Sequence, residues 1–223
     1  MRISYSALET FTTCPAKYKF QYLDRLPAPK SKEAVFGSLI HELLKMFHEP
    51  TRLAPLSEEE WLKSFTEKWD PGVYEDQQEE AFAFHQGIAI LKNYYRENQG
   101  LEFNIINLET SFEAPILDAG EFHQITGKID RIDKLEDNSF EVIDYKTARK
   151  MPAQKQIDDN LQLAIYHLGL VNRWPSFEKQ NRPVKLTIYY LKHGEKLSTI
   201  RTNQGLNETK EKILSVIDEI KKS

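Results

Sequence analysis

The sequence predicts an α/β protein in which a mixed central β-sheet is flanked by helices and the N-terminal half is helical. Two observations predict this class. Apolar residues recur at helical spacing in much of the first hundred residues, whereas three segments between residues 103 and 147 are rich in Ile, Val, Phe and Thr and alternate as strands do. The chain then continues as helix, two strands and helix, an order typical of a sheet with helices on its faces.

Composition narrows the class further. With 223 residues and 40% apolar content, the chain suffices for one domain with a substantial core. No apolar run reaches the length of a membrane span and the N-terminus lacks a secretory signal, so we expect a cytoplasmic protein with no membrane partner. The single cysteine, Cys14, excludes an internal disulfide, and we expect it to be a small buried packing residue.

Charge is segregated along the chain. The formal net charge of −4 argues against a general basic coat for nucleic acid. Basic residues nevertheless cluster between residues 17 and 32 and again between 146 and 155, with an acidic stretch between 58 and 80. For the early basic cluster, solvated helix faces are the preferred interpretation over a track for DNA.

The N-terminal half is predicted as a series of helices. Ser4 or Ser6 caps a short helix that ends near residue 13, and Pro15 begins a second one that reaches about residue 23. After a proline-rich break at 27 to 29, apolar residues from 35 onward form one helical stripe with His41 beside it. Residues 50 to 100 are predicted to be a helical insertion or cap, with one helix ending near residue 69 and another spanning 76 to 98.

The C-terminal half is predicted to supply the sheet. Strands at 103 to 115, 121 to 134 and 139 to 147 fit a three-stranded meander. A helix from about 156 to 172 follows, then strands at 184 to 192 and 196 to 202. A helix from about 206 to 221 closes the chain.

Two segments of the meander carry the residues suited to chemistry. Alternate residues of a strand share a face, so Asp144 and Lys146 project together. A hairpin centred on the turn signal at Asp137 places Asp130 opposite Asp144, with Cβ atoms roughly 5 Å apart. At that range two carboxylates repel by about 4 kcal/mol at an effective dielectric near 20, so a divalent cation between them is favoured.

A cation at this place has suitable ligands and a neighbouring ammonium group. Two or three oxygens plus water suit Mg²⁺, and the backbone carbonyl of Tyr145 is a further candidate ligand. Lys146 is placed to orient an attacking water or to stabilise a pentacoordinate phosphate. The alternative stays open that Asp130 and Asp144 are ordinary strand-end carboxylates and that Lys146 forms a surface salt bridge with one of them.

The segments G-K-I-D-R-I-D (residues 127 to 133) and E-V-I-D-Y-K-T (residues 141 to 147) resemble the core of the PD-(D/E)XK nuclease superfamily, in its RecB-like branch. The resemblance implies a restriction-endonuclease-like fold with Asp130, Asp144 and Lys146 as catalytic or metal-binding residues. G-S-L-I-H also resembles a helical segment of that family, which makes His41 a candidate metal ligand. A nitrogen ligand makes Mn²⁺ at least as suitable as Mg²⁺.

Three further residues are weighed against plainer interpretations. Q-L-A-I-Y resembles a Q-x-x-x-Y helix of the family, which implies that Gln162 and Tyr166 contact the substrate. One helical turn separates them, so they share a face, although an ordinary amphipathic helix explains the same pattern. Glu109 is placed like an acidic residue of some relatives, or it is simply a solvent-facing strand residue, and it receives lower weight.

The first 21 residues after the start also resemble the N-terminal segment of RecB-like nucleases, including CRISPR-associated ones. Many of those relatives hold an iron–sulfur cluster with a cysteine at the position of Cys14 and three more near the C-terminus. The stretch after Lys192 contains no cysteine, so we expect no cluster.

The resemblance implies a metal-dependent DNA nuclease, exonuclease-like on single strands or duplex ends, that serves repair, recombination or defence beside a helicase. A second hypothesis is a nuclease-like DNA-binding or scaffolding module of a helicase–nuclease complex with weak or no cleavage. A third is a phosphohydrolase that acts on small nucleotides. The sequence leaves exonuclease versus endonuclease action, polarity, and DNA versus RNA preference undetermined.

Overall fold

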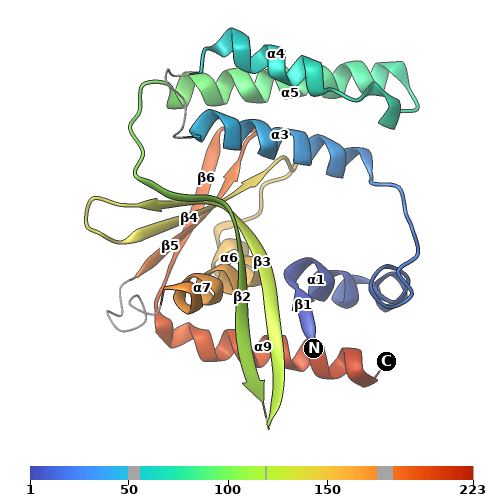
Figure 1. Ribbon diagram of the computed structural model, residues 1–223, viewed down its shortest axis with the longest axis vertical. Coiled ribbons are helices and arrows are strands. Elements are labelled where there is room, and N and C mark those ends of the chain that lie inside the picture. Colours follow the sequence, from blue (N-terminus) through green and yellow to red (C-terminus); the bar gives the residue numbers. More distant parts are fainter. Residues whose placement is uncertain (50–55, 119, 175–182, 223) are drawn as a thin grey trace.

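The computed structural model describes residues 1–49, 56–118, 120–174 and 183–222. Its described strands form one mixed sheet, with β1 (Arg2–Ser4), β3 (Glu121–Lys134), β4 (Phe140–Lys146), β5 (Val184–Tyr190) and β6 (Glu195–Arg201) in that order. β2 (Ile105–Asp118) pairs with β3 along its length, so β1 and β4 share the opposite edge of β3. Helices lie on both faces, which confirms the predicted fold class (Figure 1).

The N-terminal helices begin where their caps predict. The Ser4 side chain accepts a hydrogen bond from the Ala7 amide at 3.2 Å and starts α1 (Tyr5–Thr13). α2 (Pro15–Tyr18) and the π-helical turn η1 (Lys19–Leu23) follow. Cys14 separates α1 from α2 and is exposed, so the expectation of a buried packing residue is wrong. As the C-cap of one helix and the N-cap of the next, it lies at a bend of the chain rather than on an apolar face.

α3 (Lys32–His48) carries the long apolar stripe and lies between the sheet and two outer helices. α4 (Glu58–Lys68) begins at the predicted Ser57–Glu60 capping box, and α5 (Gln77–Asn98) follows the short helix η2 (Pro71–Val73). Together with α3 they enclose a core that includes Ile143 and Tyr145 of β4 (Figure 1). The interpretation of residues 50 to 100 as an insertion in a single domain stays a prediction, and residues 50–55 lie outside the described chain.

The opposite face of the sheet is covered by α1, α7 (Leu161–Arg173) and α9 (Leu206–Lys222), which follows the short helix η3 (Asn203–Gly205). Val142 of β4 belongs to this second core, so successive residues of β4 alternate between the two faces. The helix predicted at 156 to 172 is two helices, because α6 (Gln154–Asp158) ends and Asn160 caps α7 by accepting from the Leu163 amide at 2.9 Å.

β1 was not predicted, since three residues are too few to show a strand period. It pairs in parallel with residues 124–126 of β3, whereas β4 pairs with residues 131–134 of the same edge. Residues 127–130 lie between these two contacts, where β1 and β4 diverge from β3 and α1 begins. None of the described helices is long and apolar enough to cross a membrane.

Candidate metal centre

Asp130 lies in the interval of β3 between its contacts with β1 and β4. Arg131 pairs with Ile143, and the next pair in this register is Asp130 with Asp144. The Asp130 side chain is 8% exposed, and its Oδ2 accepts a hydrogen bond from the Tyr145 amide at 2.8 Å. A carboxylate therefore occupies the position of a strand carbonyl, and this contact fixes its orientation.

His41 reaches the same carboxylate from α3. Its Nδ1 lies 3.2 Å from Oδ1 of Asp130, and its Nε2 lies 3.0 Å from the carbonyl oxygen of Tyr145. Burial lowers the pKa of His41, but the hydrogen bond with Asp130 and the surrounding carboxylates outweigh burial, so the pKa is raised. This corner of the structure therefore favours positive charge.

Glu109 completes a compact group of possible ligands. Leu108 pairs with Arg131 and Thr110 with Ile129, so Glu109 on β2 lies opposite Asp130. Possible ligand atoms of His41, Glu109 and Asp130 all lie within 4.8 Å of one another. Glu109 has a φ of 50°, a left-handed conformation that costs a non-glycine residue about 1–2 kcal/mol. Such strain is characteristic of functional sites.

Asp144 is buried beside this group, with 2% of its surface exposed. Its Oδ1 accepts hydrogen bonds from the Tyr166 hydroxyl at 2.8 Å and from Gln162 Nε2 at 3.2 Å. The same Gln162 nitrogen donates to the Tyr166 oxygen at 2.8 Å. Both α7 residues therefore contact the carboxylate, and they reach it from one helix face.

The second oxygen of Asp144 is less well satisfied. Lys146 Nζ lies 2.8 Å from Oδ2, yet Oδ2 is buried and forms no hydrogen bond with any described residue, because the ammonium approaches off the hydrogen-bonding direction. Burial raises the pKa of Asp144, Asp130 adds to the increase, and Lys146 opposes it, so the pKa stays raised. A buried carboxylate oxygen in this state needs a cation.

The donor set fits a divalent metal. Carboxylate oxygens from Asp130, Asp144 and Glu109, with the carbonyl of Tyr145, are the hard ligands that Mg²⁺ and Mn²⁺ accept. His41 contributes a nitrogen if its proton is displaced. Asp144 lies outside the compact group of His41, Glu109 and Asp130, so its unsatisfied Oδ2 is a separate argument for a cation.

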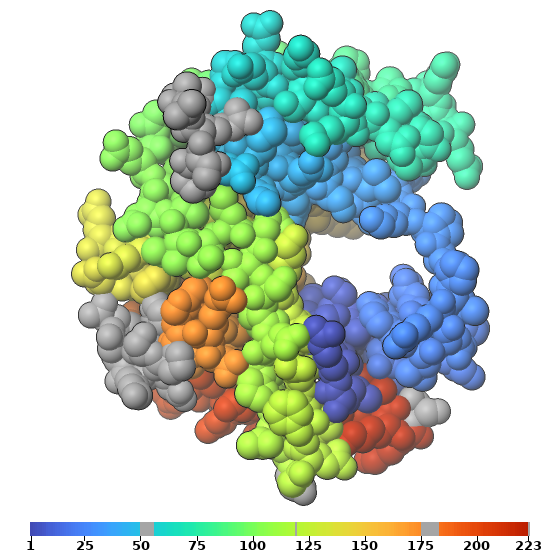
Figure 2. Space-filling view, in the orientation of Figure 1, coloured from blue at the N-terminus to red at the C-terminus, as the bar shows by residue number. Residues whose placement is uncertain are grey.

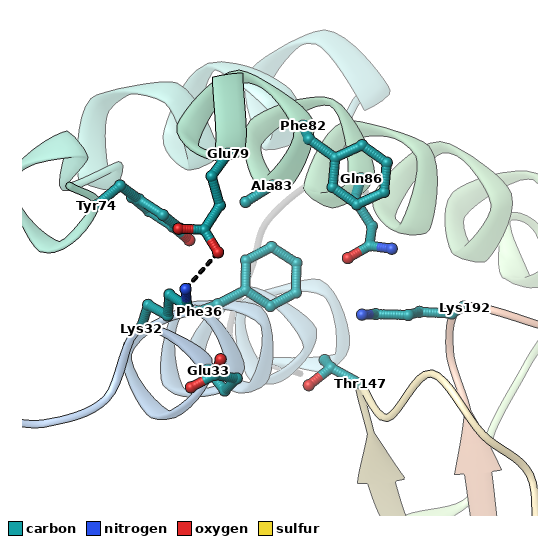
Figure 3. Close-up of a pocket in the computed structure, with 10 residues that line it drawn as sticks. All are labelled: Lys32, Glu33, Phe36, Tyr74, Glu79, Phe82, Ala83, Gln86, Thr147 and Lys192. Atoms are coloured by element: carbon teal, nitrogen blue, oxygen red, sulfur yellow. Dashed lines mark hydrogen bonds and ion pairs between the residues drawn. The ribbon is translucent and has the colours of Figure 1, made fainter. Parts of the chain in front are cut away.

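Three adjoining clefts meet at these residues. The central cleft, of about 1100 Å³, is lined by α1, by one side of α3 and by the sheet residues Glu109, Lys128, Asp130 and Lys146. Two others, of about 440 and 750 Å³, are lined by Gln162 on either side of α1. A smaller pocket of about 170 Å³ lies between α3 and α5 and includes Thr147 and Lys192 (Figure 3).

Sequence reasoning missed the contribution of α1 and undervalued Glu109. Ser6 lines all three adjoining clefts, and the exposed Glu9 lines two of them. The resemblance of the N-terminal segment was the signal available for them, but it indicated no role. Arg131, which adjoins the motif, pairs with Asp133 and is 2% exposed, so it faces away from the clefts.

Comparisons with known proteins agree with this geometry. The sequence model of the PD-(D/E)XK nuclease superfamily matches residues 2–223. One chain of an "ATP-dependent helicase/deoxyribonuclease" of Carboxydothermus hydrogenoformans is 28% identical over 199 residues, which cover 74% of this chain and 18% of that protein. Its namesake from Streptococcus agalactiae is 25% identical over 197 residues, with 81% and 17% covered. The crystal structure of SSO0001 aligns over 91% of this chain and 82% of that one, at 15% identity and a TM-score of 0.37.

The chain thus spans less than a fifth of the length of these helicase/deoxyribonuclease proteins. The family match, in contrast, extends over nearly the whole chain and includes the three adjacent strands that carry Glu109, Asp130 and Asp144. The chain therefore belongs to the PD-(D/E)XK nuclease superfamily.

Proposed function

We propose that this chain is a divalent-metal-dependent deoxyribonuclease. The observation that carries the proposal is the buried Oδ2 of Asp144, which lacks a hydrogen bond among the described residues and lies on the strand next to Asp130. An oxygen in this state costs free energy unless a cation occupies the site. Asp130, Asp144, His41 and the Tyr145 carbonyl are the proposed ligands, and Glu109 joins them.

The side chains divide the proposed chemistry among them. A divalent cation bound here activates an attacking water and neutralises charge that develops on a phosphoryl oxygen. Lys146, at the end of β4 with 35% of its side chain exposed, orients that water or donates to the phosphate. Burial lowers its pKa, but the contact with Asp144 outweighs burial and raises it, so Lys146 remains a cation and serves as an electrostatic stabiliser rather than as a general base.

Gln162 and Tyr166 are proposed to contact the substrate strand as well as Asp144. Both line the 440 Å³ cleft, and Gln162 also lines the 750 Å³ cleft, so a strand bound along either one passes these side chains. We further propose exonuclease action on single strands or duplex ends, a helicase partner and a cytoplasmic location. The names of the relatives support the first two of these.

The decisive experiment is incubation of end-labelled single-stranded and double-stranded DNA with the purified protein and Mg²⁺ or Mn²⁺. We expect cleavage that requires the metal and is lost in Asp144→Ala and Lys146→Ala. Lys150→Ala, which removes a nearby exposed cation, is the matched control and should cleave normally. Cleavage that survives both site substitutions would overturn the site assignment.

Two other results would change the assigned function. Tight DNA binding without cleavage under any condition would favour the scaffolding module of a helicase–nuclease complex. Release of phosphate from free nucleotides, with DNA left intact, would favour a small-nucleotide phosphohydrolase.

A further inference from the structure

The chain forms a ring beside the candidate metal centre. Figure 2 shows an opening that passes through the molecule between α1 and α3. These two helices belong to the cores on opposite faces of the sheet, and residues 24–31 connect them on the side away from β2 and β3 (Figure 1). The sheet, α1 with η1, residues 24–31 and α3 therefore surround the opening. We name residues 24–31 the bridging segment.

The start of the bridging segment is fixed in place. The Leu26 amide donates a 2.9 Å hydrogen bond to the Phe20 carbonyl and holds the segment against η1. Pro27 and Pro29 follow, and their rings restrict the backbone to extended conformations. The segment is therefore a stiff connection.

The end of the bridging segment is fixed as well. The Ser31 side chain accepts from the Ala34 amide at 3.2 Å and caps α3. The next residue, Lys32, forms an ion pair with Glu79 of α5, which Figure 3 shows above the start of α3. Both ends of the segment are thus tied to helices that pack on the sheet.

The opening leads to the candidate metal ligands. The central cleft is lined by Ser31 at the end of the bridging segment, by Ser6 of α1 and by Asp130 of the sheet. At about 1100 Å³ it exceeds the roughly 300–1,000 Å³ of typical small-ligand sites. A polymer that fills this cleft passes inside the ring.

We infer that a single strand of nucleic acid threads through this ring, so that the protein engages only strands with a free end. The inference rests on the proposed nuclease function. Asp130 and Asp144 are 8% and 2% exposed, so a flexible single strand can bring a phosphodiester to them more closely than a rigid duplex can. A covalently closed ring has no side entrance, which is why an end is required.

The outer part of the ring has the composition of a single-strand binding surface. Phe20 and Tyr22 of η1 are 51% and 36% exposed, and Lys17 and Lys19 are exposed beside them. Aromatic faces on which bases stack, interspersed with basic side chains, are the common means of holding a single strand without reading its sequence.

The first test is topological trapping. A labelled single-stranded oligonucleotide with biotin at both ends is mixed with the protein in EDTA, and streptavidin is added either after the protein or before it. We expect a complex that resists high salt only when the protein is added first, because ordinary phosphate contacts dissociate in salt. The same sequence ligated into a circle should give no such complex. Salt-resistant complexes that do not depend on the order of addition, or none in any arm, would overturn the inference.

The second test opens the ring. A protease site is placed within the bridging segment, and the trapped complex is treated with the protease. We expect release of the DNA, with the unmodified protein under the same protease as control. Retention after complete cleavage of the segment would contradict threading.

A cleavage assay separates this inference from the proposed function. With Mn²⁺, we expect degradation of the linear oligonucleotide and none of its circular form. Equal cleavage of both forms would overturn threading and leave the nuclease intact. Trapping without cleavage of either form would refute the nuclease and leave threading intact.

Discussion

The hydroxyl of Tyr166 donates a 2.8 Å hydrogen bond to Oδ1 of Asp144, which ties α7 to the central strand β4. This bond stabilises the charged carboxylate and so lowers the pKa of Asp144 against the larger opposing effect of burial. The position of α7 therefore controls the charge state of a candidate metal ligand.

Replacing this hydroxyl should weaken the metal site without unfolding the chain. In Tyr166→Phe, Asp144 loses a charge-assisted hydrogen bond, and loss of such a supporting contact typically reduces metal affinity by about 10–100-fold. Calorimetric titration with Mn²⁺ measures the change. Tyr95→Phe, which removes a hydroxyl from the other core, is the control and should bind the metal normally. Equal affinities for all three proteins would contradict this role of Tyr166.

Glu109 is expected to trade stability for metal binding. Its φ of 50° suits glycine, so Glu109→Gly should raise the free energy of unfolding by about 1 kcal/mol while Mn²⁺ affinity falls. The ion pair with Lys128 offsets little of this gain, because the lysine is 57% exposed. Glu109→Gln keeps the strained backbone and should lose affinity without gaining stability. Denaturant titration and calorimetry together decide the case, and a destabilised Glu109→Gly protein would argue against strain.

Gly169 allows α7 to approach β2 closely. A Cβ at this position would collide with the ring of Phe112, so Gly169→Ala should cost about 1–3 kcal/mol of stability by overpacking. Phe112→Leu should restore part of the loss in the double variant, which identifies the collision as the cause. Gly205→Ala, where no atom lies within 4 Å, is the neutral control. Thermal unfolding of the four proteins gives the comparison.

Stability should fall at mildly acidic pH because of His167. Burial, followed by the charge of Arg201, lowers its pKa to about 4, and its Nε2 has no hydrogen-bond partner among the described residues. The unfolded chain binds a proton on this histidine below about pH 6.5 whereas the folded chain does not, so between about pH 6.5 and 4 each unit of acidification removes about 1.4 kcal/mol.

The test compares wild type with His167→Leu in urea at about pH 7.5 and about pH 5. Wild type should lose roughly 2 kcal/mol more than the variant over this range. His48, whose pKa burial lowers to about 3, contributes equally to both proteins and cancels in the comparison. Parallel losses in the two proteins would assign the acid sensitivity elsewhere.

The sequence by itself determined the local part of the candidate site. The turn at Asp137 set the register that makes Asp130 opposite Asp144 the next pair, and strand alternation put Asp144 and Lys146 on one face. These relations depend on neighbours within one hairpin, where a period of two residues and one turn leave a single arrangement.

The tertiary structure alone decided what gathers around that hairpin. The parallel pairing of β1 with β3 joins residues more than 120 positions apart, and it sets α1 beside the clefts. The left-handed conformation of Glu109 has no signal in its residue type, because non-glycine residues adopt it only where their surroundings impose it. The ring closed by residues 24–31 likewise exists only because two separate cores fix its ends on opposite faces of one sheet. Such relations follow from packing of the whole chain, which local periodicity does not encode.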